Sequence, residues 1–182
     1  MRDAAILARD KGVMLHTHLV ENTKDIAYSM ERFGCRPGHY AEDLSWTGSD
    51  VWYAHCVKLD RQEIDLFARL KIGVAYCPCS NCQLGSGIAP VWDMRDAGVR
   101  VGLGVDGLAL NDGALLLGEA RKAMLLQRVS NGVDAMSSRE ALEIATRGGA
   151  EVLVCDDCGL IAVGKRPDIA IWDVSGIQSV GS

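Results

Sequence analysis

Several features that would indicate particular classes of protein are missing from this 182-residue sequence. Positive charge is not in excess, since the formal net charge is −5, and this argues against a surface that binds nucleic acid. No apolar run is long enough to cross a membrane. The first nine residues are typical of a charged amphipathic helix rather than of a signal peptide. We therefore expect a cytoplasmic protein that binds neither nucleic acid nor membranes.

The composition is also unlike that of a disordered chain. It is 48% hydrophobic and 24% charged, which suits a globular core. Seven cysteines form an odd set without an export signal, so we expect reduced thiols that mostly serve as small buried residues. The C-x-C-x-x-C spacing of Cys77, Cys79 and Cys82 and the C-x-x-C spacing of Cys155 and Cys158 leave a structural zinc site as the alternative.

Short apolar runs alternate with amphipathic stretches along most of the chain. The runs predict strands over residues 13–18, 51–56, 72–77 and 99–105. The stretches predict helices over residues 2–11, 22–33, 37–44, 61–70, 90–98, 114–129 and 138–147. This alternation is typical of an α/β protein with a parallel sheet covered by helices. Because a complete (β/α)8 barrel takes about 250 residues, we expect half a TIM-like barrel over residues 1–150, or a small open sheet.

Residues 151–182 have a different pattern. Turn residues precede an alternating apolar segment that ends at Asp173. The remaining length has no room for another strand and helix of the barrel type. We expect a linker followed by the first strand of a small β-sandwich domain.

Polar side chains stand at the ends of the predicted strands, where a barrel of this kind builds its active site. His16 and His18 are two residues apart on one strand, so their side chains face the same side. His55 ends the next strand, and Asp106 follows the last one between two glycines. Glu21 lies in the loop after His18 and is suited to acid–base chemistry. Together these residues predict a hydrolytic metal site at one rim.

Each residue also has a structural interpretation. The two histidines could be core residues with hydrogen-bonded partners. Glu21 could stabilise the start of a helix, and Asp106 could cap a turn. Taken alone, each is therefore a weak indication. Polar groups at successive strand ends are stronger evidence, because a barrel brings those ends together.

Five short motifs occur in order along the chain. They are His18-Leu19-Val20-Glu21, Trp52-Tyr53-Ala54-His55-Cys56, Pro78-Cys79-Ser80-Asn81, Leu84-Gly85-Ser86-Gly87-Ile88-Ala89-Pro90 and Gly104-Val105-Asp106-Gly107. The ordered set resembles the amidohydrolase superfamily, in its branch of nucleobase and triazine aminohydrolases, and most closely the 8-oxoguanine deaminases. The resemblance covers essentially the whole chain.

The resemblance implies a role for each residue. His18 and Asp106 would bind zinc, or another divalent metal such as iron. Glu21 would protonate a ring nitrogen of the substrate, His55 would assist the attacking water, and Asp106 would also shuttle a proton; these three would contact the substrate. The implied reaction is hydrolytic deamination of an 8-oxoguanine-like purine base by a zinc-bound hydroxide. The alternatives are a guanine or s-triazine aminohydrolase or chlorohydrolase, and a non-catalytic fragment.

The family also carries an H-x-H zinc pair on its first barrel strand, a pattern that His16-Thr17-His18 fits. Only 88 positions separate His18 from Asp106, and a βαβ unit needs about 30 residues or more. We therefore predict that the chain holds strands five to eight, and that the first-strand pair lies outside it as part of a longer enzyme. Alone, the chain should be inactive, because the two ligands His18 and Asp106 would bind the zinc too weakly. It should also self-associate as a homo-oligomer, because two apolar strand edges stay unpaired.

Overall fold

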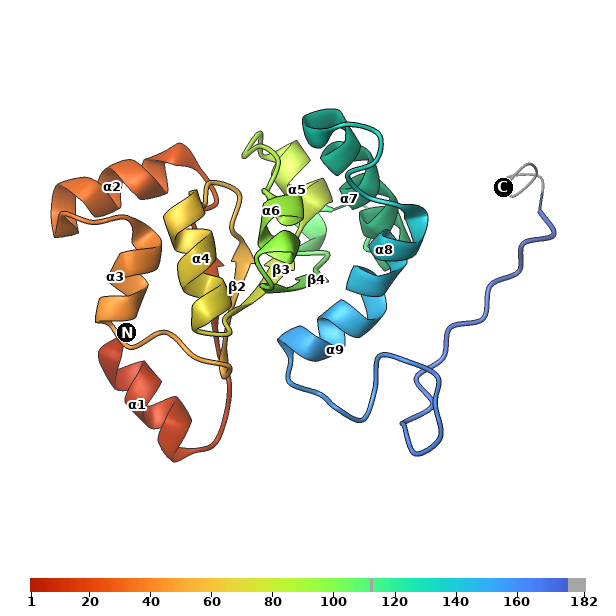
Figure 1. Ribbon diagram of the computed structural model, residues 1–182, viewed down its shortest axis with the longest axis horizontal. Coiled ribbons are helices and arrows are strands. Elements are labelled where there is room, and N and C mark those ends of the chain that lie inside the picture. Colours follow the sequence, from red (N-terminus) through yellow and green to blue (C-terminus); the bar gives the residue numbers. More distant parts are fainter. Residues whose placement is uncertain (112, 177–182) are drawn as a thin grey trace.

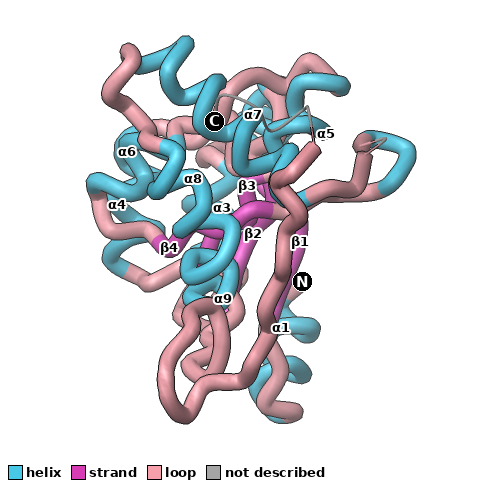
Figure 2. Tube along the Cα trace, turned by 90° about the vertical axis from the view of Figure 1, so that its right-hand side faces the viewer, coloured by secondary structure: helices cyan, strands magenta, loops and turns pink. Residues whose placement is uncertain are grey.

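The computed structural model describes residues 1–111 and 113–176 and contains a parallel sheet surrounded by helices (Figure 1). The strands lie in chain order across the sheet and are β1 (Leu15–Leu19), β2 (Val51–His55), β3 (Gly73–Tyr76) and β4 (Arg100–Leu103). Figure 2 shows the four strands adjacent to one another in a single layer. The predicted α/β class and partial barrel are therefore confirmed.

Helices follow the strands in the expected alternation. They are α1 (Arg2–Asp10), α2 (Thr23–Phe33), α3 (Pro37–Asp43), α4 (Arg61–Arg69), α5 (Pro78–Gln83), α6 (Val91–Asp96), the 3₁₀ turn η1 (Leu108–Leu110), α7 (Leu116–Asn131), α8 (Ser138–Glu143), the π-helical η2 (Ile144–Gly148) and α9 (Gly149–Val152). Among the described residues, none of these helices has the length and apolar character needed to cross a membrane. Helices α5 and α9 and the turn η1 were not expected, because their short sequences show no apolar periodicity.

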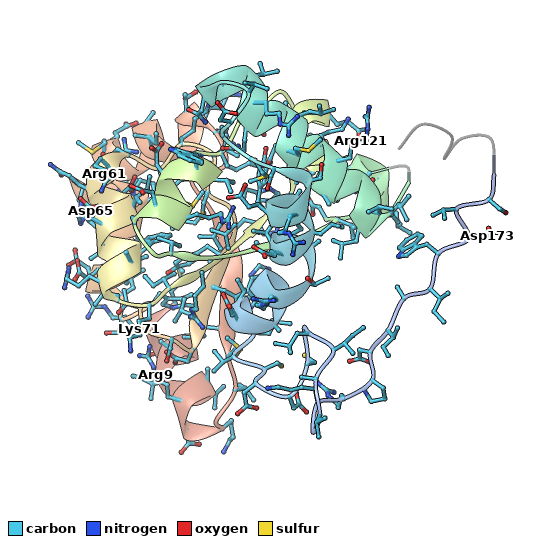
Figure 3. All side chains as sticks on the ribbon, turned by 45° about the vertical axis from the view of Figure 1, so that its right-hand side comes forward. Arg9, Arg61, Asp65, Lys71, Arg121 and Asp173 are labelled. Atoms are coloured by element: carbon cyan, nitrogen blue, oxygen red, sulfur yellow. The ribbon has the colours of Figure 1, made fainter. Side chains whose placement is uncertain are left out.

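Local sequence signals explain where several helices begin and end. Asn22 and Asp60 each accept a hydrogen bond from the first turn of α2 and α4, and an acidic residue three positions later completes a capping box. Gly34 ends α2 with a φ of 73°, a conformation that suits glycine. On the exposed side of α4, Arg61 and Asp65 form an ion pair at 2.9 Å (Figure 3).

The core lies between the sheet and the helices that cover it. Tyr53 and Tyr76 of the central strands are fully buried, and the Tyr53 ring packs against Phe67 of α4 with ring centroids 5.5 Å apart. A close backbone approach joins β4 to the last helices: a Cβ on Gly102 would lie 2.9 Å from the Cα of Gly149. Glycine is therefore required where α9 packs on the sheet.

The expected strand in the tail does not form. The described residues from 153 to 176 contain no helix or strand, and the chain runs away from the sheet after α9 (Figure 1). Ile171 is 93% exposed, and Asp173 lies well away from the sheet (Figure 3). The physical reason is that a strand needs a neighbour to satisfy its backbone groups, and no other β element lies beside this segment in the described part of the chain. Residues 177–182 of the predicted second domain lie outside the described residues.

Candidate functional site

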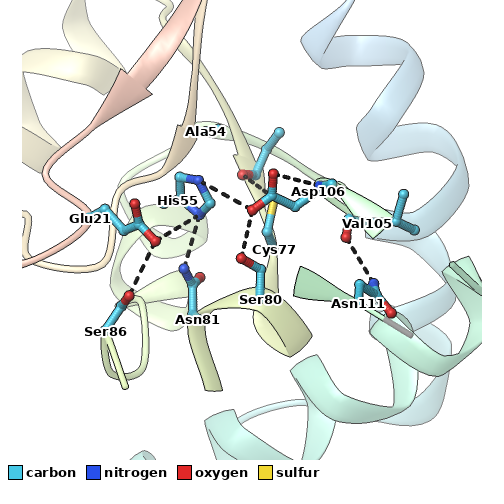
Figure 4. Close-up of polar contacts among 12 residues, drawn as sticks. Glu21, Ala54, His55, Cys77, Ser80, Asn81, Ser86, Val105, Asp106 and Asn111 are labelled. Atoms are coloured by element: carbon cyan, nitrogen blue, oxygen red, sulfur yellow. Dashed lines mark hydrogen bonds and ion pairs between the residues drawn. The ribbon is translucent and has the colours of Figure 1, made fainter. Parts of the chain in front are cut away.

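The parallel sheet brings the polar residues at its strand ends together. His18 lies near the end of β1, His55 is the last residue of β2, and one ligand atom from each of them and from Glu21 lies within 4.8 Å of the others. The Nε2 atom of His55 lies 3.8 Å from Oδ2 of Asp106, and its Nδ1 atom lies 3.9 Å from Oε1 of Glu21 (Figure 4). His55 thus stands between the two carboxylates.

The backbone turns sharply where these residues stand. His55 has a φ of 71° and Asp106 a φ of 61°, and Val20 and Cys56 beside the site also have positive φ values. Residues other than glycine rarely adopt this conformation, and such strain concentrates at functional sites. The surrounding fold therefore holds His55 and Asp106 in these conformations.

Three polar side chains from one stretch of chain hold the site residues. Ser80 of α5 donates to Oδ2 of Asp106 at 2.6 Å, and Nδ2 of Asn81 lies 2.9 Å from Nδ1 of His55. Ser86, in the loop after α5, donates to Oε1 of Glu21 at 3.2 Å. The sequence motifs included these residues without a role, because spacing along the chain does not show what a side chain contacts.

A buried carboxylate supports the loop that carries Asp106. Glu119 of α7 is 1% exposed and accepts a hydrogen bond from the Cys79 backbone N–H at 2.9 Å. It also accepts from the amide of Asn111, which donates a second hydrogen bond to the carbonyl of Val105 at 2.8 Å. Glu119 therefore links α7 to the start of α5 and to the turn beside Asp106.

The surroundings lower the pKa values of both His55 and Asp106. Burial lowers the pKa of His55, because it disfavours the charged ring, although the carboxylates of Glu21 and Asp106 oppose this. Burial raises the pKa of Asp106, but hydrogen bonds from Ser80 and Gly107 outweigh it, so the pKa lies below its usual value. The site thus favours a neutral imidazole beside an ionised carboxylate.

A cleft of about 220 Å³ opens beside these groups and is lined by His16, His18, Trp52, Cys77, Asp106 and apolar residues of the strands and α9. Burial, together with Asp106, raises the pKa of the Cys77 thiol to about 12. Cys77 therefore stays a neutral thiol in this structure, and the part of the cleft that it lines is only weakly polar.

His16 does not join the cluster. Its ring stacks on Trp52 with centroids 3.5 Å apart, and its Nδ1 atom lies 3.3 Å from the Trp52 carbonyl oxygen. The structure also places only β2 and β3 between the strands that precede Glu21 and Asp106. This spacing matches the last half of a barrel and not the first to the eighth strand, so His16 and His18 are not the first-strand pair.

The two cysteine spacings differ in the structure, and the seven cysteines are free thiols in it. Among the described residues, the first three-cysteine spacing forms no cluster of ligand atoms, whereas Cys155, Asp157 and Cys158 bring theirs within 4.8 Å of one another. The Asp157 carboxylate is already paired with Arg166 at 2.9 Å. The tail cysteines are therefore neighbours, but one of their three candidate ligands has a partner.

The donor set at the strand ends fits a borderline divalent cation. Zinc accepts imidazole nitrogen and carboxylate oxygen, and His18 and Asp106 offer one of each to the same cleft. His55 and Glu21 lie next to these donors but are engaged by Asn81 and Ser86. His16 lines the same cleft, but its ring is stacked on Trp52. His18 and Asp106 are therefore the two donors that we assign to the metal, and a complete zinc site needs about four.

The family model described as "Amidohydrolase family" matches residues 1–180. The chain belongs to the amidohydrolase family. Two relatives are 8-oxoguanine deaminase from Pseudomonas aeruginosa, 38% identical over 100% of this chain and 40% of its own length, and isoxanthopterin deaminase from an unknown prokaryotic organism, 43% identical over 94% and 39%. The chain therefore spans about 40% of the length of these amidohydrolases.

Solved structures share this fold closely. Atrazine chlorohydrolase from Arthrobacter aurescens TC1, crystallised with zinc, superposes with a TM-score of 0.91 at 39% identity over 98% of this chain and 40% of that one. An adenosine deaminase from Xanthomonas campestris with bound zinc gives a TM-score of 0.94 at 31% identity over 99% and 42%. These amidohydrolases contain zinc, and the similarity includes the strands that carry the candidate site.

Proposed function

We propose that this chain forms the proton-transfer half of a zinc-dependent aminohydrolase that deaminates a purine base similar to 8-oxoguanine and releases ammonia. One observation carries the proposal: His55 stands between the carboxylates of Glu21 and Asp106, with His18 beside them, at the carboxyl ends of parallel strands. In barrels of this kind, catalytic groups occupy that rim.

His18 and Asp106 are the residues of this chain that would hold zinc. A zinc ion in such a site lowers the pKa of water toward neutrality and so supplies a nucleophile at physiological pH. About four ligands are typical, and the family resemblance assigns two of them to an H-x-H pair on another strand. The complete activity therefore belongs to a longer protein than the residues described.

Glu21 is placed to donate a proton to the substrate. Its side chain is 18% exposed, one of its oxygens lies 3.9 Å from His55, and Ser86 donates a hydrogen bond to that oxygen. Protonating a ring nitrogen draws electron density from the adjacent carbon and favours attack by water there. His55 orients that water, and Asp106 accepts its proton and passes it to the leaving amine.

The runner-up substrate class is an s-triazine. The specific observation in its favour is the 39% identity to atrazine chlorohydrolase, which is similar to the identity to the deaminase relatives. Both classes present a planar nitrogen-rich ring with a leaving group on carbon. The same acid–base set could therefore serve either reaction.

The test uses the longest in-frame product, which is the longest protein that the reading frame encodes and that includes these residues, purified with zinc. It measures the ammonia or chloride that this protein releases from each substrate. We expect ammonia from 8-oxoguanine, with lower rates from guanine and isoxanthopterin. Chloride release from atrazine without ammonia from the purines would favour the triazine alternative. Zinc-loaded protein that acts on none of these substrates would overturn the proposal and favour a non-catalytic role.

A further inference from the structure

Asn81 makes a buried contact with the central histidine of the site. Its Nδ2 atom lies 2.9 Å from Nδ1 of His55, and the two side chains are 0% and 1% exposed (Figure 4). An amide NH₂ group only donates hydrogen bonds, so Nδ1 must accept. In a neutral ring, the proton then resides on Nε2.

Two carboxylates also face the ring, one at each nitrogen. Nε2 lies 3.8 Å from Oδ2 of Asp106 and Nδ1 lies 3.9 Å from Oε1 of Glu21, so neither carboxylate is within hydrogen-bond distance. Because ionised carboxylates only accept hydrogen bonds, the two favour protons on opposite nitrogens and largely offset each other. The 2.9 Å contact with Asn81 therefore decides which nitrogen carries the proton.

The fold holds the Asn81 backbone on both sides. Its N–H donates to the Cys77 carbonyl at 3.0 Å, and its carbonyl accepts from the Ser86 N–H at 2.9 Å. Its side-chain oxygen has no partner among the described residues. If the Asn81 amide were rotated by half a turn, its NH₂ group would occupy the position where the oxygen now has no partner. Two unpaired N–H donors would then be buried in place of one unpaired acceptor, which costs more free energy.

We infer that Asn81 is a positioning residue that sets the tautomer of His55, keeping Nδ1 bare and the proton on Nε2. Its consequence for catalysis rests on the proposed function: an N–H on Nε2 donates to the attacking water and orients it. The tautomer itself is a property of this chain and is measurable without metal or substrate. Failure of the deaminase proposal would thus leave the tautomer result standing.

The test is long-range ¹H–¹⁵N NMR of the metal-free 182-residue chain, at a pH where the rings are neutral. The sequence has only four histidines, so replacing His16, His18 and His39 in turn with Gln assigns the His55 signals. The protonated and bare ring nitrogens differ widely in chemical shift. We expect the parent chain to show the proton on Nε2, and a proton on Nδ1 would overturn the inference.

Two variants separate a positioning role from a merely structural one. Asn81→Asp replaces the donor with an acceptor and should move the proton to Nδ1, whereas Asn81→Ala should give a mixture of tautomers. Asn131→Ala, at an exposed asparagine at the end of α7, should change nothing. A variant ring that keeps the parent tautomer in a folded chain would contradict the inference, and the parent measurement alone decides if a variant fails to fold.

A kinetic measurement then examines the consequence for catalysis in the longest in-frame product. We expect Asn81→Asp to lower kcat by more than about tenfold and to change KM by less than about threefold, since His55 would no longer orient the water. A change in KM with an unchanged kcat would contradict an orienting role. This arm requires an active parent, and the NMR arm does not.

Discussion

His55 and Asp106 come from strands that are not neighbours, yet Nε2 of the one lies 3.8 Å from Oδ2 of the other. Strand β3 lies between them, and the chain turns through a positive φ at each residue to bring them together. A single helix, α5, then holds both, through Ser80 and Asn81. The two side chains form one hydrogen-bonded unit with the helix that follows β3.

The first prediction concerns the metal. His18→Ala should weaken zinc binding by more than about tenfold, because it removes one of the two zinc donors, His18 and Asp106, that we assign to this chain. Zinc bound after gel filtration, measured by elemental analysis, checks this. His39→Ala on α3 is the control and should bind zinc as the parent does. Equal zinc in both variants would exclude His18 as a ligand.

The second prediction separates proton donation from metal binding. Glu21→Gln should keep its zinc and lose about 10²–10⁴-fold in kcat in the longest in-frame product, because an amide cannot donate an acidic proton. Glu31→Gln, on the exposed side of α2, should leave both unchanged. Turnover within a factor of about two of the parent would mean that Glu21 serves only the start of α2.

The third prediction tests the buried carboxylate behind the site. Glu119→Ala leaves the Cys79 N–H and the Asn111 amide without their acceptor and should cost about 1–3 kcal/mol of unfolding free energy. Denaturation in urea measures this loss. Lys122→Ala, exposed on the same helix, should change stability by less than about 0.5 kcal/mol. Similar losses in both variants would show that truncating any side chain of α7 destabilises the protein, and that the hydrogen bonds of Glu119 are not the cause.

The fourth prediction is a pH dependence far from the site. Hydrogen bonds from the Ser137 N–H and hydroxyl lower the pKa of Glu140, and Arg95 lies 3.2 Å away. Because the folded-state pKa lies below the unfolded value of about 4.3, this carboxylate stabilises the fold above that pH, and the stabilisation is lost as the pH falls through the lowered pKa.

Glu140→Gln should therefore lower stability by about 1 kcal/mol at neutral pH and make little difference in strong acid. Urea denaturation at several pH values measures the difference between variant and parent. A difference that does not depend on pH would show that the charge of Glu140 is not involved.

The fifth prediction concerns the two sheet edges. Within residues 1–111 and 113–176, β1 and β4 each pair with only one strand, so the 182-residue chain should form dimers or larger assemblies. The Leu15 N–H donates to the carbonyl of Asp50, just before β2. Because backbone groups of successive residues point to opposite sides of a strand, the N–H of His16 faces the open edge of β1. His16→Pro should then reduce the assembly, as measured by light scattering after gel filtration. A parent chain that is monomeric would contradict the prediction.

The sequence by itself determined the four strands of the sheet, the longer helices and their order. Buried parallel strands are continuous apolar runs, and capping residues such as Asn22 and Asp60 mark helix starts, so these signals are local. It also identified His18, Glu21, His55 and Asp106 as candidates, because side chains at the ends of parallel strands must share one edge. The role of each stays a prediction.

Only the tertiary structure decided what holds those side chains. Asn81, Ser80 and Glu119 contact residues 26 to 40 positions away in the chain, and no local pattern encodes such distances. His16 and His18 line the same cleft, as their spacing predicts, but only the structure showed that the His16 ring stacks on Trp52 of the neighbouring strand while His18 joins Glu21 and His55. The tail segment has the alternation of a strand but forms none, since a strand is stable only when another one supplies its hydrogen-bond partners.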